Sequence, residues 1–331
     1  MKPMASLSLD LDNEWSYLKT HGDPRWQGYP SYLDVVVPRI LDLLERMQLH
    51  ITFFVVGQDA ALDRNRKALA SISAAGHEIG NHSFHHEPWL HLYSEEEHEQ
   101  EFAAAEEHIE AATGIHPVGF RGPGFSLSET TLRVLKRRRY RYDASTLPTF
   151  LGPLARAYYF MTAKLDAEER RKRKLLFGSA RDGLRSIRAY KWRIGDETLL
   201  EIPVTTLPIL RVPFHLSYIL YLSTFSPALA RAYFANALRL CQWTGTQPSL
   251  LLHPLDFLGA EDVDSLRFFP AMQLPAVVKL ERVEWCLSRY AERFDVRPLG
   301  EHAEALENDH RLRLVAPNFQ PSAIAHRGHR R

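Results

Sequence analysis

Strand-like and helix-like segments alternate along this chain, and that order limits the folds open to it more than any other feature. Residues 37–47 have a helical apolar pattern and precede a strand-like run over residues 51–56, and residues 95–112 form a charged amphipathic helix. Alternation of this kind predicts a parallel β/α barrel, whose active site lies at the carboxyl ends of the strands. Further strand-like runs cover residues 118–121, 141–143, 199–204 and 249–253.

Two carboxylates are expected side by side at the end of the first strand. Residues 6–12 read Ser-Leu-Ser-Leu-Asp-Leu-Asp, and alternate side chains of a strand share a face. The leucines then point one way, whereas Asp10 and Asp12 point the other way. Two like charges this close are costly unless a cation or a proton lies between them. A metal ion on one and an arginine on the other would remove the repulsion.

Two histidines four residues apart follow a strand-like approach over residues 76–81. Taken alone, a His-x-x-x-His pair is more often a surface helix face than a ligand pair, and a lone Asp-x-Asp is usually a turn or a solvated edge. Both patterns in one chain favour another interpretation, because a catalytic zinc-type centre uses three protein ligands and leaves a position open for water. We therefore predict that Asp12, His82 and His86 bind a metal ion.

Five short motifs resemble, in order, those of the polysaccharide deacetylase family, the group that includes chitooligosaccharide and peptidoglycan N-deacetylases. The resemblance covers residues 5–145 and 198–300, and its most specific part is the histidine motif. Most of the family has adjacent aspartates in the first motif, whereas Leu11 separates them here. By order, Asp10 corresponds to the base and Asp12 to the metal ligand, with Glu14 as an outside candidate. The motifs are Asp10-Leu11-Asp12, His82-Ser83-Phe84-His85-His86, Arg121-Gly122-Pro123-Gly124-Phe125, Asp143-Ala144-Ser145 and Leu251-Leu252-His253.

The resemblance implies a distorted (β/α)7 barrel that hydrolyses an amide with the help of a divalent transition metal. Asp10 would take a proton from the attacking water, and Arg121 would pair with Asp10 and orient it. His253 would protonate the departing amine, since an imidazole titrates near neutral pH, and Asp143 would orient His253. The alternatives are a helix or turn cap for Asp143 and a strand-end histidine bonded to backbone for His253. Zinc is the expected metal, although nickel, cobalt and iron share these ligands.

One barrel domain is expected over residues 1–305, with an insertion over residues 147–197, an apolar segment over 209–226 and a flexible, basic tail over 306–331. From residue 170 to residue 193 there are ten Lys or Arg residues against one acidic residue. Residues 212–225 carry no charge and are too few to span a bilayer, which takes about twenty residues. These segments are either a solvated basic helix beside a buried helix, or a basic and aromatic surface that rests on a membrane.

Composition agrees with a soluble enzyme that has no nucleic-acid partner. The net charge of +1 implies no general attraction to nucleic acid. Cys241 and Cys286 are too few for a disulfide framework, so free core cysteines are expected. The chain reaches its first strand almost at once, without a signal peptide, so the cytoplasm, or the inner face of the membrane, is the expected compartment. The oligomeric state is left open.

The function that these residues favour is removal of an N-acyl group, most often N-acetyl, from an amino sugar in a glycan, a glycolipid or a polyprenyl-linked intermediate. Two alternatives stay open. One is deformylation or hydrolysis of another non-polymeric amide, and the other is a binding protein that keeps the fold without turnover. The enzyme is favoured because a binding protein would not need the pairing of acid and base groups that Asp10, Arg121 and His253 provide.

Overall fold

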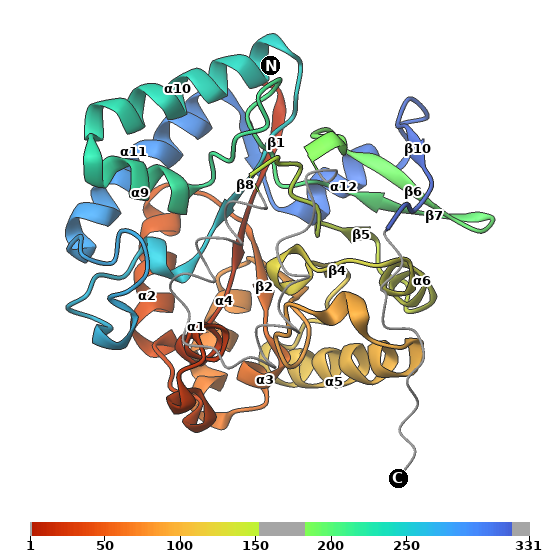
Figure 1. Ribbon diagram of the computed structural model, residues 1–331, viewed down its shortest axis with the longest axis horizontal. Helices are drawn as coiled ribbons and strands as arrows, with labels where there is room; N and C mark the ends of the chain where they lie inside the picture. The colour runs from red at the N-terminus through yellow and green to blue at the C-terminus, as the bar shows by residue number, and fades with distance from the viewer. Residues whose placement is uncertain (1, 152–182, 320–331) are drawn as a thin grey trace.

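Seven parallel strands form a distorted barrel in the computed structural model, which describes residues 2–151 and 183–319 (Figure 1). Within the described residues, strands pair in the order β7–β5–β4–β3–β2–β1–β8. The chain after β7 closes the barrel without a regular ladder, because Val204 N donates to Thr146 O (2.9 Å) and Thr205 N donates to Ser249 O (3.0 Å). The strands are β1 (Met4–Asp10), β2 (Thr52–Val55), β3 (Glu78–Asn81), β4 (Gly119–Phe120), β5 (Tyr142–Asp143), β7 (Glu197–Glu201) and β8 (Ser249–Leu252).

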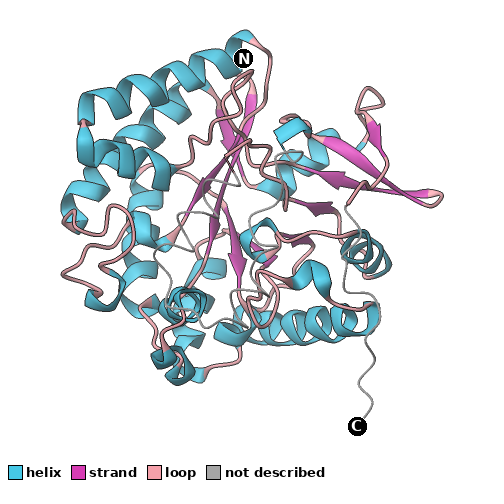
Figure 2. Ribbon diagram, in the orientation of Figure 1, coloured by secondary structure: helices cyan, strands magenta, loops and turns pink. Residues whose placement is uncertain are grey.

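Helices cover the outside of the barrel (Figure 2). In α2 (Leu33–Arg46), Val36, Ile40 and Leu43 recur at helical spacing and are fully buried. Burying one such side chain contributes about 1.5–3 kcal/mol, so this stripe holds the helix against the sheet. The other helices are α1 (Glu14–His21), α3 (Gly57–Ala60), α4 (Arg66–Ala74), α5 (Glu95–Thr113), α6 (Glu129–Arg137), α9 (Leu216–Phe225), α10 (Pro227–Trp243), α11 (Ala276–Arg293) and α12 (Leu299–Glu307).

Alternation along β1 separates apolar from polar side chains, as the sequence predicts. Leu7 and Leu9 are fully buried in the main apolar core, which the sheet shares with α2 and other helices. Ser8 and Asp10 take the other face, where Arg121 from the end of β4 donates a hydrogen bond to each of them. The interior of the barrel is therefore polar at this level, and it is there that charged groups meet.

Three further strands extend the sheet beyond the barrel (Figure 1). β6 (Tyr190–Ile194) is antiparallel to β7, and β10 (Leu314–Val315) pairs with β6. β9 (Asp295–Arg297) lies beside the first residues of β1. The expected insertion thus ends in a hairpin, and the start of the expected tail includes a strand. Residues 152–182 and 320–331 of these two segments lie outside the described residues.

The expected apolar segment forms α9, a helix with one buried and one exposed side. The buried side packs on α10, α11 and the end of β8, and the exposed side carries three aromatic rings. The alternatives of a buried helix and an aromatic surface therefore each describe half of this element. Residues 170–182 of the expected basic run lie outside the described residues. The buried side includes Leu216, Ile219 and Leu220, and the exposed rings are Tyr218, Tyr221 and Phe225.

The helices α10 and α11, which pack against α9, complete this part of the core. Cys241 on α10 and Cys286 on α11 are buried and form no disulfide, as expected. Among the described residues, no helix combines the length and the apolar composition that crossing a membrane requires.

Candidate active site

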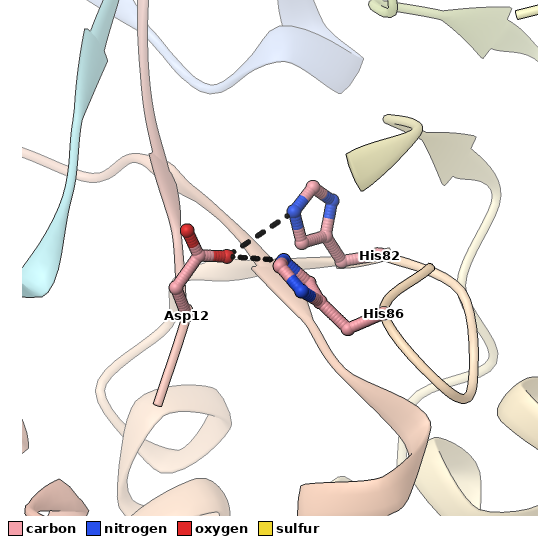
Figure 3. A group of neighbouring side chains, drawn as sticks. All are labelled: Asp12, His82 and His86. Atoms are coloured by element: carbon pink, nitrogen blue, oxygen red, sulfur yellow. Dashed lines mark hydrogen bonds and ion pairs between the residues drawn. The ribbon is translucent and has the colours of Figure 1, made fainter. Parts of the chain in front are cut away.

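Three expected metal ligands converge just beyond the carboxyl ends of β1 and β3 (Figure 3). Asp12 Oδ1 lies 2.9 Å from His86 Nε2 and 3.3 Å from His82 Nε2. The three candidate ligand atoms lie within 4.8 Å of one another, and all three residues are buried. The register of the sheet explains the meeting, because β2 pairs with both β1 and β3 and brings their ends to the same edge.

The two histidines lie on a tight loop, not on a helix face. Ser83 and His86 have left-handed backbone conformations, with φ of 61° and 53°. Side chains hold this loop: Asn81 Oδ1 accepts from Ser83 N (2.8 Å), and Glu101 Oε1 accepts from the backbone of the next two residues. Such conformations are costly for residues other than glycine and persist only when neighbours fix them. The loop therefore turns both imidazoles toward Asp12.

Hydrogen bonding and charge prepare this cluster for a cation. His82 Nδ1 lies 2.7 Å from Arg121 O, so it carries the proton and leaves Nε2 free as a ligand. Burial raises the pKa of Asp12, but His86 and His82 outweigh burial and hold that pKa well below its usual value. The pKa of His82 is lowered by burial and raised more strongly by Asp10 and Asp12. Two imidazoles and one ionised carboxylate are a donor set that fits a catalytic transition metal.

Arg121 bonds to Asp10, the aspartate that is not among the three candidate ligands, as expected from the repulsion between the two carboxylates. Its Nη1 donates to Asp10 Oδ1 (2.7 Å) and to Ser8 Oγ (2.9 Å), and its Nε donates to Ala144 O (3.0 Å). The guanidinium is fully buried and lies over the ring of Phe54, 4.4 Å from its centroid. Asp10 is therefore held in one orientation, beside the three candidate ligands but bonded to a different partner.

His253 follows β8 and lies on the same edge of the barrel. The pairing of Leu9 with Leu252 places Asp10 and His253 next to each other at the ends of adjacent strands. His253 Nδ1 lies 3.1 Å from Ser217 Oγ, and its backbone nitrogen donates to Asp256 Oδ2 (2.8 Å). The imidazole thus contacts a side-chain hydroxyl, and His253 also caps the turn that follows β8.

The structure does not place Asp143 in contact with His253. Asp143 pairs in register with Glu201 on β7 and accepts from the Ser145 hydroxyl. Burial, and then the neighbouring Glu201 carboxylate, raise the pKa of Asp143 well above its usual value. β7 and its continuation lie between β5 and β8, so Asp143 and His253 are not on neighbouring strands.

Several site residues were missed by the sequence interpretation. Ser217 and Asp256 surround His253, and only the His-x-x-Asp spacing at residues 253–256 could have indicated one of them. His215 caps α9, with its ring centroid 5.6 Å from that of His253 and no hydrogen-bond partner for Nδ1 among the described residues. Burial, followed by the charges of His253 and Arg121, holds the pKa of His215 well below its usual value.

The outside candidate Glu14 takes no part in the cluster. It is the first residue of α1, and its carboxylate accepts from Ser265 Oγ (2.6 Å).

Comparisons with known proteins agree with this geometry. A model of the polysaccharide deacetylase family matches residues 27–142, which include both histidines and Arg121. A peptidoglycan deacetylase of Helicobacter pylori is 29% identical over 120 residues, which are 36% of this chain and 40% of that protein. The peptidoglycan-N-acetylmuramic acid deacetylase PdaA of Bacillus subtilis is 32% identical over 112 residues, which are 34% of this chain and 41% of that protein.

These matches span about two fifths of the curated relatives' lengths. A solved structure from Mycobacterium smegmatis, named as a candidate polysaccharide deacetylase, has a TM-score of 0.61 and 20% identity. The alignment covers 97% of this chain and 99% of that one. The likeness therefore extends over the whole barrel, including the strands beyond residue 142.

Proposed function

The chain belongs to the polysaccharide deacetylase family, and on that premise we propose that it is a metal-dependent hydrolase that removes N-acetyl groups from an amino sugar of a glycan. One observation carries the proposal: Asp12, His82 and His86 aim their ligand atoms at one point, and a buried Asp10–Arg121 pair lies beside it. We also propose that residues 1–305 are one catalytic domain, to which residues 147–197 are an insertion.

The proposed metal ligands are Asp12 Oδ1, His82 Nε2 and a ring nitrogen of His86. A bound divalent metal, zinc in our proposal with nickel, cobalt or iron as alternatives, would polarise the acyl carbonyl and lower the pKa of water. His82 Nδ1–H on the Arg121 carbonyl fixes the direction of that ligand nitrogen.

The chain's own residues move the protons. Asp10 accepts the proton of the water that forms the new carbon–oxygen bond, and Arg121 holds the accepting carboxylate in place. As the carbon–nitrogen bond breaks, His253 gives a proton to the departing nitrogen. The products are acetate and a free amino sugar. Asp10 and His253 suit these steps because they lie at the ends of adjacent strands.

The proposed substrate is an N-acetylated amino sugar of peptidoglycan or of a related glycan, because the named relatives are peptidoglycan deacetylases. A lipid-linked intermediate at the cytoplasmic face of a membrane is the finer form of the proposal. It is supported by the exposed rings of Tyr218, Tyr221 and Phe225 on α9, the helix that begins beside His253. Removal of a formyl group or hydrolysis of a non-sugar amide would use the same residues.

The test of the reaction is acetate release from soluble N-acetylglucosamine oligomers and from purified peptidoglycan. Wild-type protein should release acetate, chelation should abolish the release, and zinc should restore it. The Asp10→Asn variant is the negative control, and Arg133→Met, an exposed arginine, is the matched positive control. No acetate from either substrate by metal-loaded protein would reject the proposed removal of N-acetyl groups.

The membrane form of the proposal has its own test. Sedimentation with anionic vesicles should show binding that weakens at high salt, since each basic residue near an anionic surface adds about 1 kcal/mol. The Tyr221→Ser variant should bind less than Val277→Ser, which removes a more exposed apolar side chain from α11. Equal activity on lipid-free sugars without vesicle binding would reject the membrane form alone.

A further inference from the structure

We infer that Ser217 and Asp256 position His253 for proton transfer to the leaving group, with the Ser217 hydroxyl bridging the imidazole and the buried carboxylate. The inference rests on the proposed function, and it assigns to these two residues the orienting role first expected of Asp143. None of the three groups binds the metal ion in our proposal.

The bridge is continuous on the side of His253 that carries Nδ1. Ser217 Oγ lies 3.1 Å from His253 Nδ1 and donates to Asp256 Oδ1 (2.8 Å). Asp256 Oδ2 accepts from the backbone nitrogen of His253 (2.8 Å), so one carboxylate holds both the main chain and, through Ser217, the ring. Asp256 is 1% exposed, and this isolation from water strengthens each of these bonds.

The hydrogen-bond directions follow from the chemistry of the groups. An ionised carboxylate only accepts, so the single hydroxyl proton of Ser217 goes to Asp256. Ser217 Oγ then accepts from His253 Nδ1–H. This bond fixes the neutral tautomer of His253 with its proton on Nδ1, and it survives when the ring is doubly protonated. Nε2 is therefore the nitrogen that gains and loses the proton, and it is the nitrogen left for the substrate.

Two different elements have to meet to form the bridge. Ser217 lies in the first turn of α9, and Asp256 ends a short 3-10 turn, Pro254–Asp256, directly after β8. Lys279 on α11 adds support, because its buried ammonium donates to Leu255 O (2.8 Å), next to Asp256. His215 caps α9 near His253, and because burial holds its pKa well below the usual value, it does not compete with His253 as a proton donor.

A purely structural role for Ser217 and Asp256 makes a different prediction from a positioning role. Hydrolysis of an amide needs a proton on the departing amine, whereas an aryl acetate has a leaving group that departs without one. Loss of positioning should therefore reduce amide hydrolysis selectively. Loss of folding would reduce both reactions equally.

The experiment compares kcat and KM of metal-loaded variants on an N-acetylglucosamine oligomer and on 4-nitrophenyl acetate. For Ser217→Ala and Asp256→Asn, we expect kcat on the oligomer to fall by about ten- to a hundredfold, less than the full general-acid contribution of about 10²–10⁴, with KM little changed. The ester rate should change less than about threefold. Ser217→Thr, which keeps the hydroxyl, should restore most of the oligomer activity, and Thr224→Ala, also on α9, should behave as wild type. Equal losses on both substrates, or no loss on the oligomer, would overturn the inference.

A second readout does not need turnover. Nitrogen NMR of the imidazoles, with the His253 signals assigned by their loss in His253→Ala, should show an Nδ1–H tautomer in wild type. In Ser217→Ala, the signals should shift toward a mixture of tautomers. Identical His253 signals in both proteins would overturn the inference even if the wild type hydrolysed neither substrate, an outcome that would reject the proposed function separately.

Discussion

Arg121 gives the sharpest stability prediction, because its ion pair with Asp10 is buried on both sides. Arg121 is fully buried and Asp10 is 5% exposed, so replacing Arg121 with methionine leaves a buried carboxylate without its charged partner. Breaking a buried pair in this way costs about 3–5 kcal/mol, and at about 2 °C per kcal/mol for a chain of this size Tm should fall by about 6–10 °C.

The assay is thermal unfolding of chelated protein, so that metal binding does not contribute. The double variant Arg121→Met with Asp10→Asn should lose less free energy of unfolding than the two single variants lose together, by at least about 1 kcal/mol. The reason is that the double variant no longer contains the buried charge. Arg133→Met is the matched control, since its ion pairs are exposed, and it should lower Tm by about 2 °C or less. The reasoning would be refuted if Arg121→Met lowered Tm no more than the control does, or if the effects of the two single substitutions on stability were strictly additive.

Three further predictions concern the metal, the protons and pH. The His82→Ala and His86→Ala proteins should stay folded but lose most of their bound metal by elemental analysis, and full occupancy in both would contradict the assigned ligands. Asp10→Asn and His253→Ala should keep the metal and lose about 10²–10⁴ in kcat, whereas loss of metal in Asp10→Asn would reverse the two aspartates. Burial raises the pKa of Asp59 from 3.8 to about 7, so the folded state holds a proton that the unfolded chain has released and stability falls as pH rises through that interval. The Tm of Asp59→Asn relative to wild type should therefore be higher at pH 8 than at pH 5, and a constant difference would contradict the raised pKa.

Patterns that depend on neighbouring residues were predictable from the sequence. Alternation in β1 correctly placed Asp10 away from Leu7 and Leu9, because a strand fixes which side chains share a face. The meeting of Asp12 with His82 also followed, since parallel strands end at one edge of the sheet. These features need only local periodicity and strand order.

Contacts that depend on how distant elements pack were not predictable. The motif order suggested Asp143 as the partner of His253, but the spacing of motifs along a chain does not fix which strands separate them. Ser217 lies 36 residues before His253, and its contact depends on the position of α9 against the turn after β8. The four-residue spacing of His82 and His86 was likewise compatible with a helix, whereas the structure has a loop that is held by bonds from Asn81 and Glu101, among others.

Arg121 contributes to the site through its side chain and through its backbone. Its guanidinium donates to Asp10, and its carbonyl oxygen accepts from His82. A shift of the chain at this one position would therefore alter metal affinity and proton transfer together. The next residue has little room for such a shift, because a Cβ on Gly122 would lie 2.1 Å from Ser126 O. Substitutions in the loop that follows β4 should thus change metal affinity and proton transfer in proportion. Engineering that adjusts Asp10 without disturbing the metal ligands would have to begin elsewhere, at Ser8 or Phe54.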